Sequence, residues 1–307
     1  MKKIALVIVN WNGHIDTAHC LESIKRMNIP NGLMVETIVV DNGSTDTSVA
    51  YLSKTFPWVT LLTLGENLGF TGGNNIGIQY SLKKGADYIW LLNNDTIVDS
   101  HVLSIVHAFS NDSVGVAGSK IYFSPGHEYH KNRYSKKEIG KVFWYAGGLV
   151  DWDNMYASHR GVDEVDTGQY DVLIDTAFVT GCSMMIKREV IEKIGKLDDH
   201  FYLYLEDLDF GLRAKLSGFR LVYFPKSIVW HVNAGSSGGA GNPIHDYYIT
   251  RNRLLIGLRY ASLRTKFALF REAVRFLRIG NPIKKQAVKD FFLNKWGKRY
   301  EPKKIHA

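Results

Sequence analysis

The stretch "WLLNNDTIVD", residues 90–99, decides the fold because an apolar run ends abruptly in Asn93, Asn94 and Asp95. The Trp-Leu-Leu run predicts a buried strand. A carboxylate at the end of a buried strand is costly unless a partner compensates its charge. We therefore expect a positive group beside Asp95, and we favour a metal ion.

The segments around this stretch alternate between strand-like and helical patterns. Strands separated by helices of this length predict right-handed βαβ units and a parallel sheet covered by helices on both faces, a nucleotide-binding type of α/β domain. Ligands of such sheets lie beyond the carboxyl ends of the strands, where "NWNG", "DNGSTD", "GENLGFTGGNN" and "NNDT" fall. The expected strands cover residues 3–11, 35–43, 59–65 and 87–95, and the expected helices cover 17–27, 46–54 and 74–85.

The remainder of the chain has a less regular pattern. Residues 124–170 form a long insertion rich in charged and aromatic residues, and such insertions are usually functional or mobile. The segment "NAGSSGGAGNP", residues 233–243, predicts a flexible boundary before a basic tail. Between them we expect a strand at 175–186, helices at 188–195 and 205–218, and strand-like runs at 219–225 and 227–232.

Composition excludes disorder, since 45% of the 307 residues are hydrophobic and 22% are charged. The net charge of +8 is uneven: residues 251–307 carry 16 Lys and Arg against 3 Asp and Glu, whereas residues 1–250 carry 22 against 27. Cys20 and Cys182 lack metal-like spacing, which favours a reduced compartment, and we expect a cytoplasmic protein. The initial apolar run breaks at Asn10, and no segment approaches the roughly 20 apolar residues of a membrane span. We expect a soluble chain or one held to a surface.

Two glycine-containing turns follow predicted strands. In "VVDNGSTD", residues 39–46, Asp41 either belongs to an ordinary turn before a helix cap or accepts a hydrogen bond from the imide N–H of uracil or thymine. The segment "GENLGFTGGNNIGI", residues 65–78, lacks both the dinucleotide fingerprint and the P-loop. Its glycines still allow a ligand to approach the backbone, and "GGNN" opens a helix that can face negative charge.

Three acidic residues begin the predicted helix at 205–218. Acidic capping is worth roughly 0.3 to 1 kcal/mol and accounts for one of them. Glu206, Asp207 and Asp209 together suit a general base beside a sugar. His231 is either a core histidine or a ligand. "LLNNDT" is either a turn or a relative of the D-x-D motif, in which Asp95 holds a cation and Asn93 or Asn94 reaches a ribose.

Six segments carry a resemblance to a known family: "VIVNWNG", "VVDNGSTD", "NLGFTGGNNIGI", "LLNNDT", "EDLDFGLRAKLSGFR" and "RNRLL". In this order they resemble inverting glycosyltransferase family 2, whose members have the GT-A fold, and they are most similar to its rhamnosyltransferase-like branch. The resemblance covers roughly residues 3–260. It implies nucleotide contacts at Val9, Asn10, Asp41, Asn67, Asn74, Asn93 and Asn94, Mn²⁺ or Mg²⁺ on Asp95 and His231, and a catalytic base at Asp207 with Glu206 as its rival. Asn93 stands where the family usually has the first Asp of D-x-D, so the expected metal site has one carboxylate fewer than is usual in the family.

The resemblance implies a metal-dependent inverting transferase. Residues 1–235 would form the GT-A domain, with a nucleotide-sugar half at 1–120 and an acceptor half at 121–235, and residues 236–307 a linker and basic helical extension. The donor would be dTDP-rhamnose or a UDP-hexose, and the acceptor a hydroxyl of a glycan or lipid-linked molecule in cell-surface polysaccharide synthesis. Candidate acceptor contacts in the insertion are Trp144, Tyr145 and Trp152, for which simple aromatic packing is the alternative.

The basic tail has an apolar stripe with helical spacing, formed by Leu263, Phe267, Phe270, Val274 and Leu277. Arg264, Arg271, Arg275 and Arg278 form a parallel row about 100° around the axis. The helix either docks on the catalytic domain or lies on an anionic membrane, such as the inner face of the cell membrane. A nucleic-acid-binding tail and a catalytically silent nucleotide-sugar scaffold are the competing functions, but the expected ligand clefts lie in the acidic body.

Overall fold

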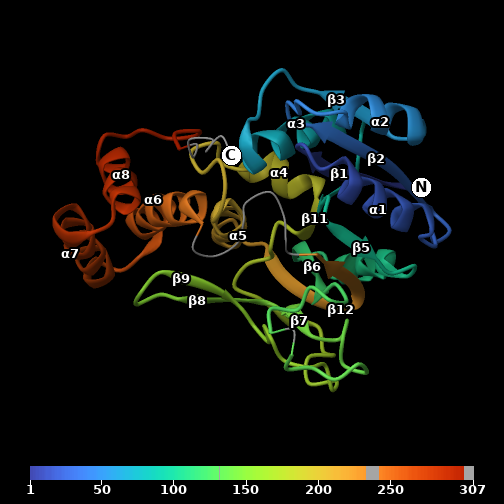
Figure 1. The fold of residues 1–307 in the computed structure, drawn as a ribbon. Helices are drawn as coiled ribbons and strands as arrows, with labels where there is room; N and C mark the ends of the chain where they lie inside the picture. The colour runs from blue at the N-terminus through green and yellow to red at the C-terminus, as the bar shows by residue number, and fades with distance from the viewer. Residues whose placement is uncertain (131, 233–241, 301–307) are drawn as a thin grey trace.

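The computed structural model describes residues 1–130, 132–232 and 242–300, and one large sheet runs through it (Figure 1). The strands are β1 (Lys2–Asn10), β2 (Leu33–Asp41), β3 (Thr60–Thr63), β4 (Tyr88–Asn93), β5 (Thr96–Val98), β6 (Val114–Phe123), β7 (Phe143–Tyr145), β8 (Gly148–Asp151), β9 (Tyr156–His159), β10 (Ile174–Asp175), β11 (Ser183–Lys187) and β12 (Arg220–His231). The helices are α1 (His14–Lys25), α2 (Ser48–Thr55), α3 (Gly69–Lys83), the 3₁₀ helix η1 (Val102–Ser110), α4 (Arg188–Ile194), α5 (Glu206–Leu216), α6 (Pro243–Tyr260), α7 (Leu263–Ile279) and α8 (Pro282–Phe292).

The strand order in the sheet is β10-β12-β6-β11-β4-β1-β2-β3. β1 is parallel to β2 and β4, β2 to β3, and β6 to β12, whereas β11 is antiparallel to both of its neighbours. The predicted mostly parallel sheet is therefore confirmed. From β1 the strand order runs outward through β2 to β3, and the chain then returns to place β4 on the other side of β1. The strand order therefore reverses between β1 and β4, and ligands of such sheets bind at the carboxyl ends of the strands at this switch point.

Alternating side chains of β1 serve the two faces of the sheet. Ile4, Leu6 and Ile8 belong to the apolar core that includes residues of α1, α2 and η1. Ala5 and Val7 belong to the core that includes residues of α3, α4 and α5. Helix α3 lies very close to β1, because a Cβ added at Gly77 would be 2.2 Å from Cγ1 of Val7. A Cβ added at Gly73, nearer the start of α3, would be 2.8 Å from Cγ1 of Val9, so the first half of α3 packs against the carboxyl end of β1.

Both cysteines lie in the core as free thiols, as the sequence predicts. Burial raises the pKa of the Cys20 thiol to about 12. Burial likewise raises the pKa of Cys182 well above its usual value. A thiol in this state is a poor nucleophile and a poor metal ligand, so neither cysteine carries chemistry.

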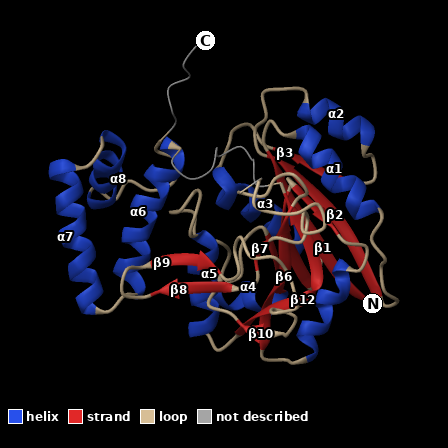
Figure 2. Ribbon diagram, turned by 60° about the horizontal axis from the view of Figure 1, so that its bottom comes forward, coloured by secondary structure: helices blue, strands red, loops and turns tan. Residues whose placement is uncertain are grey.

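Helices α6, α7 and α8 stand together at the side of the molecule away from α1 and α2 (Figures 1 and 2). The β8–β9 hairpin reaches this group, where Arg253 of α6 donates through Nε and Nη2 to the carbonyl of Asn154 at 2.9 and 2.7 Å. Most of the glycine-rich boundary predicted at 233–243 lies outside the described residues. Among the helices of the described ranges, none has the length and apolar character to cross a bilayer.

Candidate active site

Asp95 and His231 meet because the short strand β5 pairs with the end of β12. In this antiparallel pairing His231 lies opposite Thr96, and the N–H of Val232 donates to the carbonyl of Asp95 at 2.9 Å. Nε2 of His231 lies 3.1 Å from Oδ1 of Asp95, and both residues are buried. Two residues that are 136 positions apart in the chain are thus adjacent at the carboxyl end of β4.

The pair joins a buried carboxylate to a buried imidazole. Burial acts to raise the pKa of Asp95, but attraction to the neighbouring His231 outweighs it and the pKa lies below its ordinary value. Nδ1 of His231 is buried without a hydrogen-bond partner in the described structure, and the Trp144 ring lies edge-on with its centroid 4.5 Å from the imidazole centroid. The strand end therefore presents one carboxylate and one imidazole.

These donors fit a divalent ion. Carboxylate oxygen and imidazole nitrogen are both ligands that proteins offer to divalent metals. No group of three or more His, Cys, Asp and Glu side chains suited to a metal occurs within residues 1–130, 132–232 and 242–300. An ion held by Asp95 and His231 would take its other ligands from phosphate and water, which is usual for Mg²⁺ in nucleotide sites.

A chain of hydrogen bonds ties the neighbouring strand ends together. Asn94 Nδ2 donates to Thr17 Oγ1 at 3.1 Å, and Thr17 Oγ1 donates to Asn10 Oδ1 at 2.8 Å. Asn10 Nδ2 in turn donates to Asp41 Oδ2 at 2.7 Å. Thr17 on α1 links the ends of β1 and β4, and its sequence context carries no signal for this role. The backbone N–H of Asn93 donates to the carbonyl of Cys182 on the other side of β4.

Asp41 lies at the end of β2 and is 1% exposed. Besides Asn10, it accepts from the N–H of Ser44 at 3.0 Å and from the Ser44 hydroxyl at 2.7 Å. Its carboxylate therefore has three donors within the protein, as the turn explanation requires. The backbone of Val9 continues β1 up to this point.

The turn before α3 is held by asparagines. Asn42, which the sequence marks only as a turn residue, donates to Asn67 Oδ1 at 3.0 Å and to the Gly69 carbonyl at 2.9 Å, and accepts from the N–H of Leu68 at 3.0 Å. Asn74 donates to the Phe70 carbonyl at 2.9 Å. The side chains of Asn67 and Asn74 thus bond to protein groups that shape this turn.

Glu206 and Asp207 begin α5, and burial governs both. Burial raises the pKa of Asp207, and the N–H groups of Gly181 and Leu208, at 3.0 and 2.8 Å, only partly offset it. Glu206 is buried, its Oε2 has no partner in the described structure, and burial together with the charge of Asp207 raises its pKa well above the usual value. Burial therefore outweighs the favourable helix dipole at both acids.

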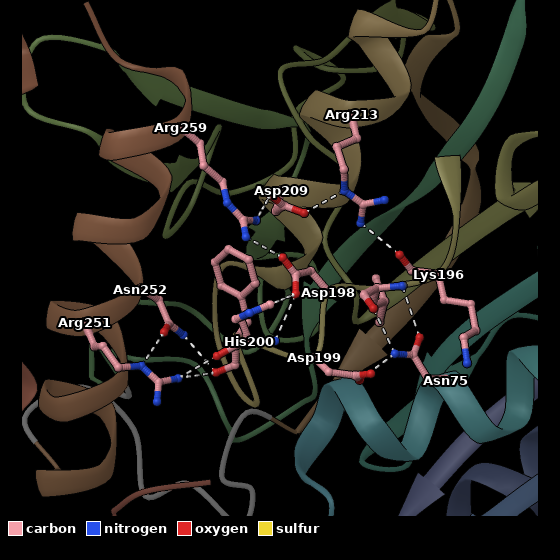
Figure 3. Close-up of polar contacts among 12 residues, drawn as sticks. Asn75, Lys196, Asp198, Asp199, His200, Asp209, Arg213, Arg251, Asn252 and Arg259 are labelled. Carbon is pink, nitrogen blue, oxygen red and sulfur yellow. Dashed lines mark hydrogen bonds and ion pairs between the residues drawn. The ribbon is translucent and has the colours of Figure 1, made fainter. Parts of the chain in front are cut away.

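The third acid, Asp209, is structural. It is fully buried, and its carboxylate accepts from Arg213 at 2.7 Å and from Arg259 and the Tyr260 hydroxyl at 2.8 Å each. Arg259 also pairs with Asp198 at 2.6 Å, and Figure 3 shows Asp198 and Asp209 gathered beside this guanidinium. With two guanidinium partners and no exposed surface, Asp209 has no free position for a substrate.

The loop before α5 is held by α6. Asn252 Nδ2 donates to the carbonyls of Phe201, Leu203 and Tyr204 at 3.1, 2.8 and 2.9 Å. Arg251 Nη2 donates to the carbonyls of His200 and Phe201 at 3.0 and 2.9 Å, as Figure 3 shows for His200. These two side chains are completely buried. In the sequence they belong to "RNRLL", a segment of the family resemblance that implies no role for them.

The same loop touches the start of α3. Tyr202 packs directly on Gly69, where an added Cβ would lie 2.4 Å from Cδ2 of the tyrosine, and its carbonyl accepts from the N–H of Thr71 at 3.2 Å. Further along α3, Asn75 donates to Asp199 at 2.7 Å. The segment that carries Asp207 is therefore fixed both to α6 and to the glycine-rich start of α3.

The three candidate acceptor residues differ in how far their side chains are exposed. The assignment of Tyr145 is wrong, because this residue is fully buried and its hydroxyl donates to the Phe178 carbonyl at 2.8 Å. Trp144 is half-buried and lies against His231 and His159. Trp152 is 46% exposed in the turn between β8 and β9. Only these two tryptophans retain surface for an acceptor.

The chain belongs to the family described as glycosyltransferase like family 2, whose model matches residues 2–242. It is 26% identical over 265 residues to a dTDP-rhamnosyl transferase of Shigella flexneri, covering 82% of this chain and 79% of the relative. Over 218 residues it is 26% identical to an N-acetylglucosaminyl-diphospho-decaprenol L-rhamnosyltransferase of Mycobacterium tuberculosis, covering 66% and 68%. The chain also matches a relative from Haloferax volcanii, and it spans 61% of that relative's length.

The fold is similar to that of a solved mannosyltransferase of Pyrobaculum calidifontis in complex with GDP-Man and Mn²⁺. The TM-score is 0.54 at 15% identity, and the match covers 95% of this chain and 74% of that one. This likeness concerns the fold alone. With the family match, it confirms the predicted GT-A fold and the predicted membership of glycosyltransferase family 2.

Proposed function

We propose that this glycosyltransferase moves a sugar from a nucleoside-diphosphate donor to an acceptor hydroxyl with inversion at the anomeric carbon. The observation that carries the proposal is the Asp95–His231 contact of 3.1 Å at the switch point of the sheet. An anionic diphosphate cannot bind beside a lone carboxylate without a positive charge between them. We therefore assign Asp95 and His231 to Mn²⁺ or Mg²⁺, which when bound acts as a Lewis acid toward the departing diphosphate.

The protein's own residues have two further tasks in this reaction. Asn10 and Asp41 at the ends of β1 and β2 orient the nucleobase, with Asn67, Asn74, Asn93 and Asn94 lining the rest of the nucleotide. Asp207 takes the proton of the acceptor hydroxyl as this oxygen attacks the anomeric carbon from the face opposite the diphosphate. The raised pKa of Asp207 strengthens it as a base, and burial together with the charge of Asp207 holds the pKa of Glu206 well above its usual value.

We propose dTDP-rhamnose as the donor and a lipid-linked glycan as the acceptor. The donor rests on the relative from Shigella flexneri that is described as a dTDP-rhamnosyl transferase. The acceptor rests on the relative from Mycobacterium tuberculosis that is described as acting on N-acetylglucosaminyl-diphospho-decaprenol. Trp144 and Trp152 are the proposed acceptor contacts, and UDP-hexoses are the alternative donors.

A thermal-shift panel tests the donor and the metal together. A ligand that binds only the folded state at 100 times its Kd adds about 2.7 kcal/mol of stability. We expect dTDP-rhamnose with Mn²⁺ to raise the Tm more than either alone or than a UDP-hexose with Mn²⁺. In the Asp95→Asn variant, the part of the shift that depends on the metal should disappear. Equal stabilisation with and without Mn²⁺ in the wild-type protein would reject the metal assignment.

Glu206 gives a prediction about pH and stability. Its folded-state pKa is raised, so the stability it contributes is complete below the unfolded pKa of about 4.3 and is lost as pH rises through the folded value. Glutamine keeps the shape and the neutral state at every pH. We expect Glu206→Gln to unfold at a higher temperature than wild type in mildly alkaline buffer, with the difference shrinking toward acidic pH. Parallel Tm curves for the two proteins across pH would contradict a neutral Glu206.

A further inference from the structure

Helix α7 packs with a different face from the one its sequence pattern suggests. Thr265, Leu269 and Ala273 are the buried residues of this helix. Leu263 and Phe267, which belong to the predicted apolar stripe, are 84% and 62% exposed. The first half of the stripe is therefore not what docks the helix, and it is left uncovered, whereas Leu277 at its far end packs against the core.

The uncovered surface continues onto the neighbouring helices. Phe270 of α7 is more than half exposed, and its ring centroid lies 6.1 Å from that of Phe292 at the end of α8. Both side chains and the exposed Leu258 of α6 line an apolar cavity of about 300 Å³. We call Leu258, Leu263, Phe267, Phe270 and Phe292 the α7 face. An exposed apolar patch of this kind is a common mark of a protein or membrane interaction site.

A row of arginines flanks the α7 face. Arg264, Arg271, Arg275 and Arg278 are all exposed, and none has an ion-pair partner among the described residues. Glu272, the single acid of the helix, pairs with Arg253 of α6 at 2.8 Å. Over residues 242–300 the chain carries 14 Lys and Arg against 3 Asp and Glu. The α7 face is therefore bordered by uncompensated positive charge.

We propose that the α7 face docks on an anionic lipid bilayer. The leucine and phenylalanine side chains enter the boundary between headgroups and acyl chains, the cavity between Phe270 and Phe292 accepts a lipid chain, and the arginine row contacts anionic headgroups. A second copy of the chain would bring the same positive row against itself, which disfavours a symmetric dimer through this face. The inference goes beyond glycosyl transfer and does not depend on it.

Sedimentation with lipid vesicles tests the proposal on the full chain without donor or acceptor. We expect binding to vesicles of phosphatidylcholine and phosphatidylglycerol in equal amounts, weaker binding at high salt, and little binding to phosphatidylcholine alone. Replacing an arginine of the row by glutamine should weaken binding about fivefold per residue. Leu263→Ser with Phe267→Ser should also weaken binding, and both exposed positions allow the variant to fold.

A matched control removes as many charges from α1, α2 and the end of α3 as the arginine variant, in which Arg264, Arg271, Arg275 and Arg278 are all replaced by glutamine, removes from α7. Vesicle binding should be nearly unchanged after replacement by glutamine of four exposed lysines: Lys25, Lys54, Lys83 and Lys84. Equal binding to neutral and anionic vesicles would overturn the proposal, and so would wild-type binding by the arginine variant. Light scattering that shows a dimer, which the serine variant dissociates, would assign the α7 face to a second copy instead.

Discussion

Replacing Asp207 by Asn is expected to lower kcat by about 10²- to 10⁴-fold, the usual contribution of a general base, with donor affinity close to wild type. Asparagine keeps the size of the side chain and one oxygen that can accept from Gly181, but it cannot take a proton from the acceptor. The Asp95–His231 pair belongs to different elements and stays intact. Single-turnover rates with saturating donor, together with the donor-induced Tm shift, separate the two effects.

Glu206→Gln is the matched control, because it changes the neighbouring acid of the same helical turn. The amide keeps the size of Glu206 and the uncharged form that its raised pKa favours, so kcat should stay near wild type. Wild-type kcat/KM should fall as pH is lowered through the raised pKa of Asp207, since the base must be ionised to act. An active Asp207→Asn variant beside an inactive Glu206→Gln variant would move the base to Glu206.

The parts of the site that sequence predicts well are those that depend on local pattern. Apolar runs of strand length that end in polar clusters place Asn10, Asp41 and Asn93 at one edge of a parallel sheet, because the carboxyl ends of parallel strands share that edge. The contact between Asp95 and His231 depends on a three-residue strand, β5, that pairs with β12. So short a strand has no periodicity to detect, and this pairing came from the family resemblance.

Other differences arise from tertiary packing that one sequence does not reveal. The sequence around Pro225 reads as two separate strand-like runs, but the structure has the single strand β12. The register of its pairing with β6 shifts between Phe224 and Ile228, and this irregularity accommodates the proline within the strand. In β7, side chains alternate between faces, so Tyr145 is buried while Trp144 is only half-buried. Helix α7 has apolar residues on two sides, and only its neighbours determine which side is covered.

Replacing Asn252 by Ala should lower the free energy of unfolding by about 3 kcal/mol, since each buried polar group left unsatisfied costs about 1 to 3 kcal/mol. The amide of Asn252 satisfies three carbonyls of the loop at 201–204. This loop also contains strain, because Tyr202, Tyr204 and Leu205 have φ angles of 65°, 68° and 68°, in the left-handed region. Arg251 still donates to the Phe201 carbonyl in the variant, so the carbonyls of Leu203 and Tyr204 are the ones that lose their Asn252 donor.

Removing the Asn252 amide should also impair catalysis, since Leu205 of the loop directly precedes the helix that begins with Glu206 and Asp207. We expect Asn252→Ala to reduce kcat at temperatures where the protein remains folded, and Asn252→Asp to be at least as damaging, because it keeps the shape but removes the donor. Asn28→Ala, which removes one exposed contact to His101, should stay within about 0.5 kcal/mol of wild type in urea titrations. If Asn252→Ala matched that control in stability and turnover, α6 would not be what positions the proposed base.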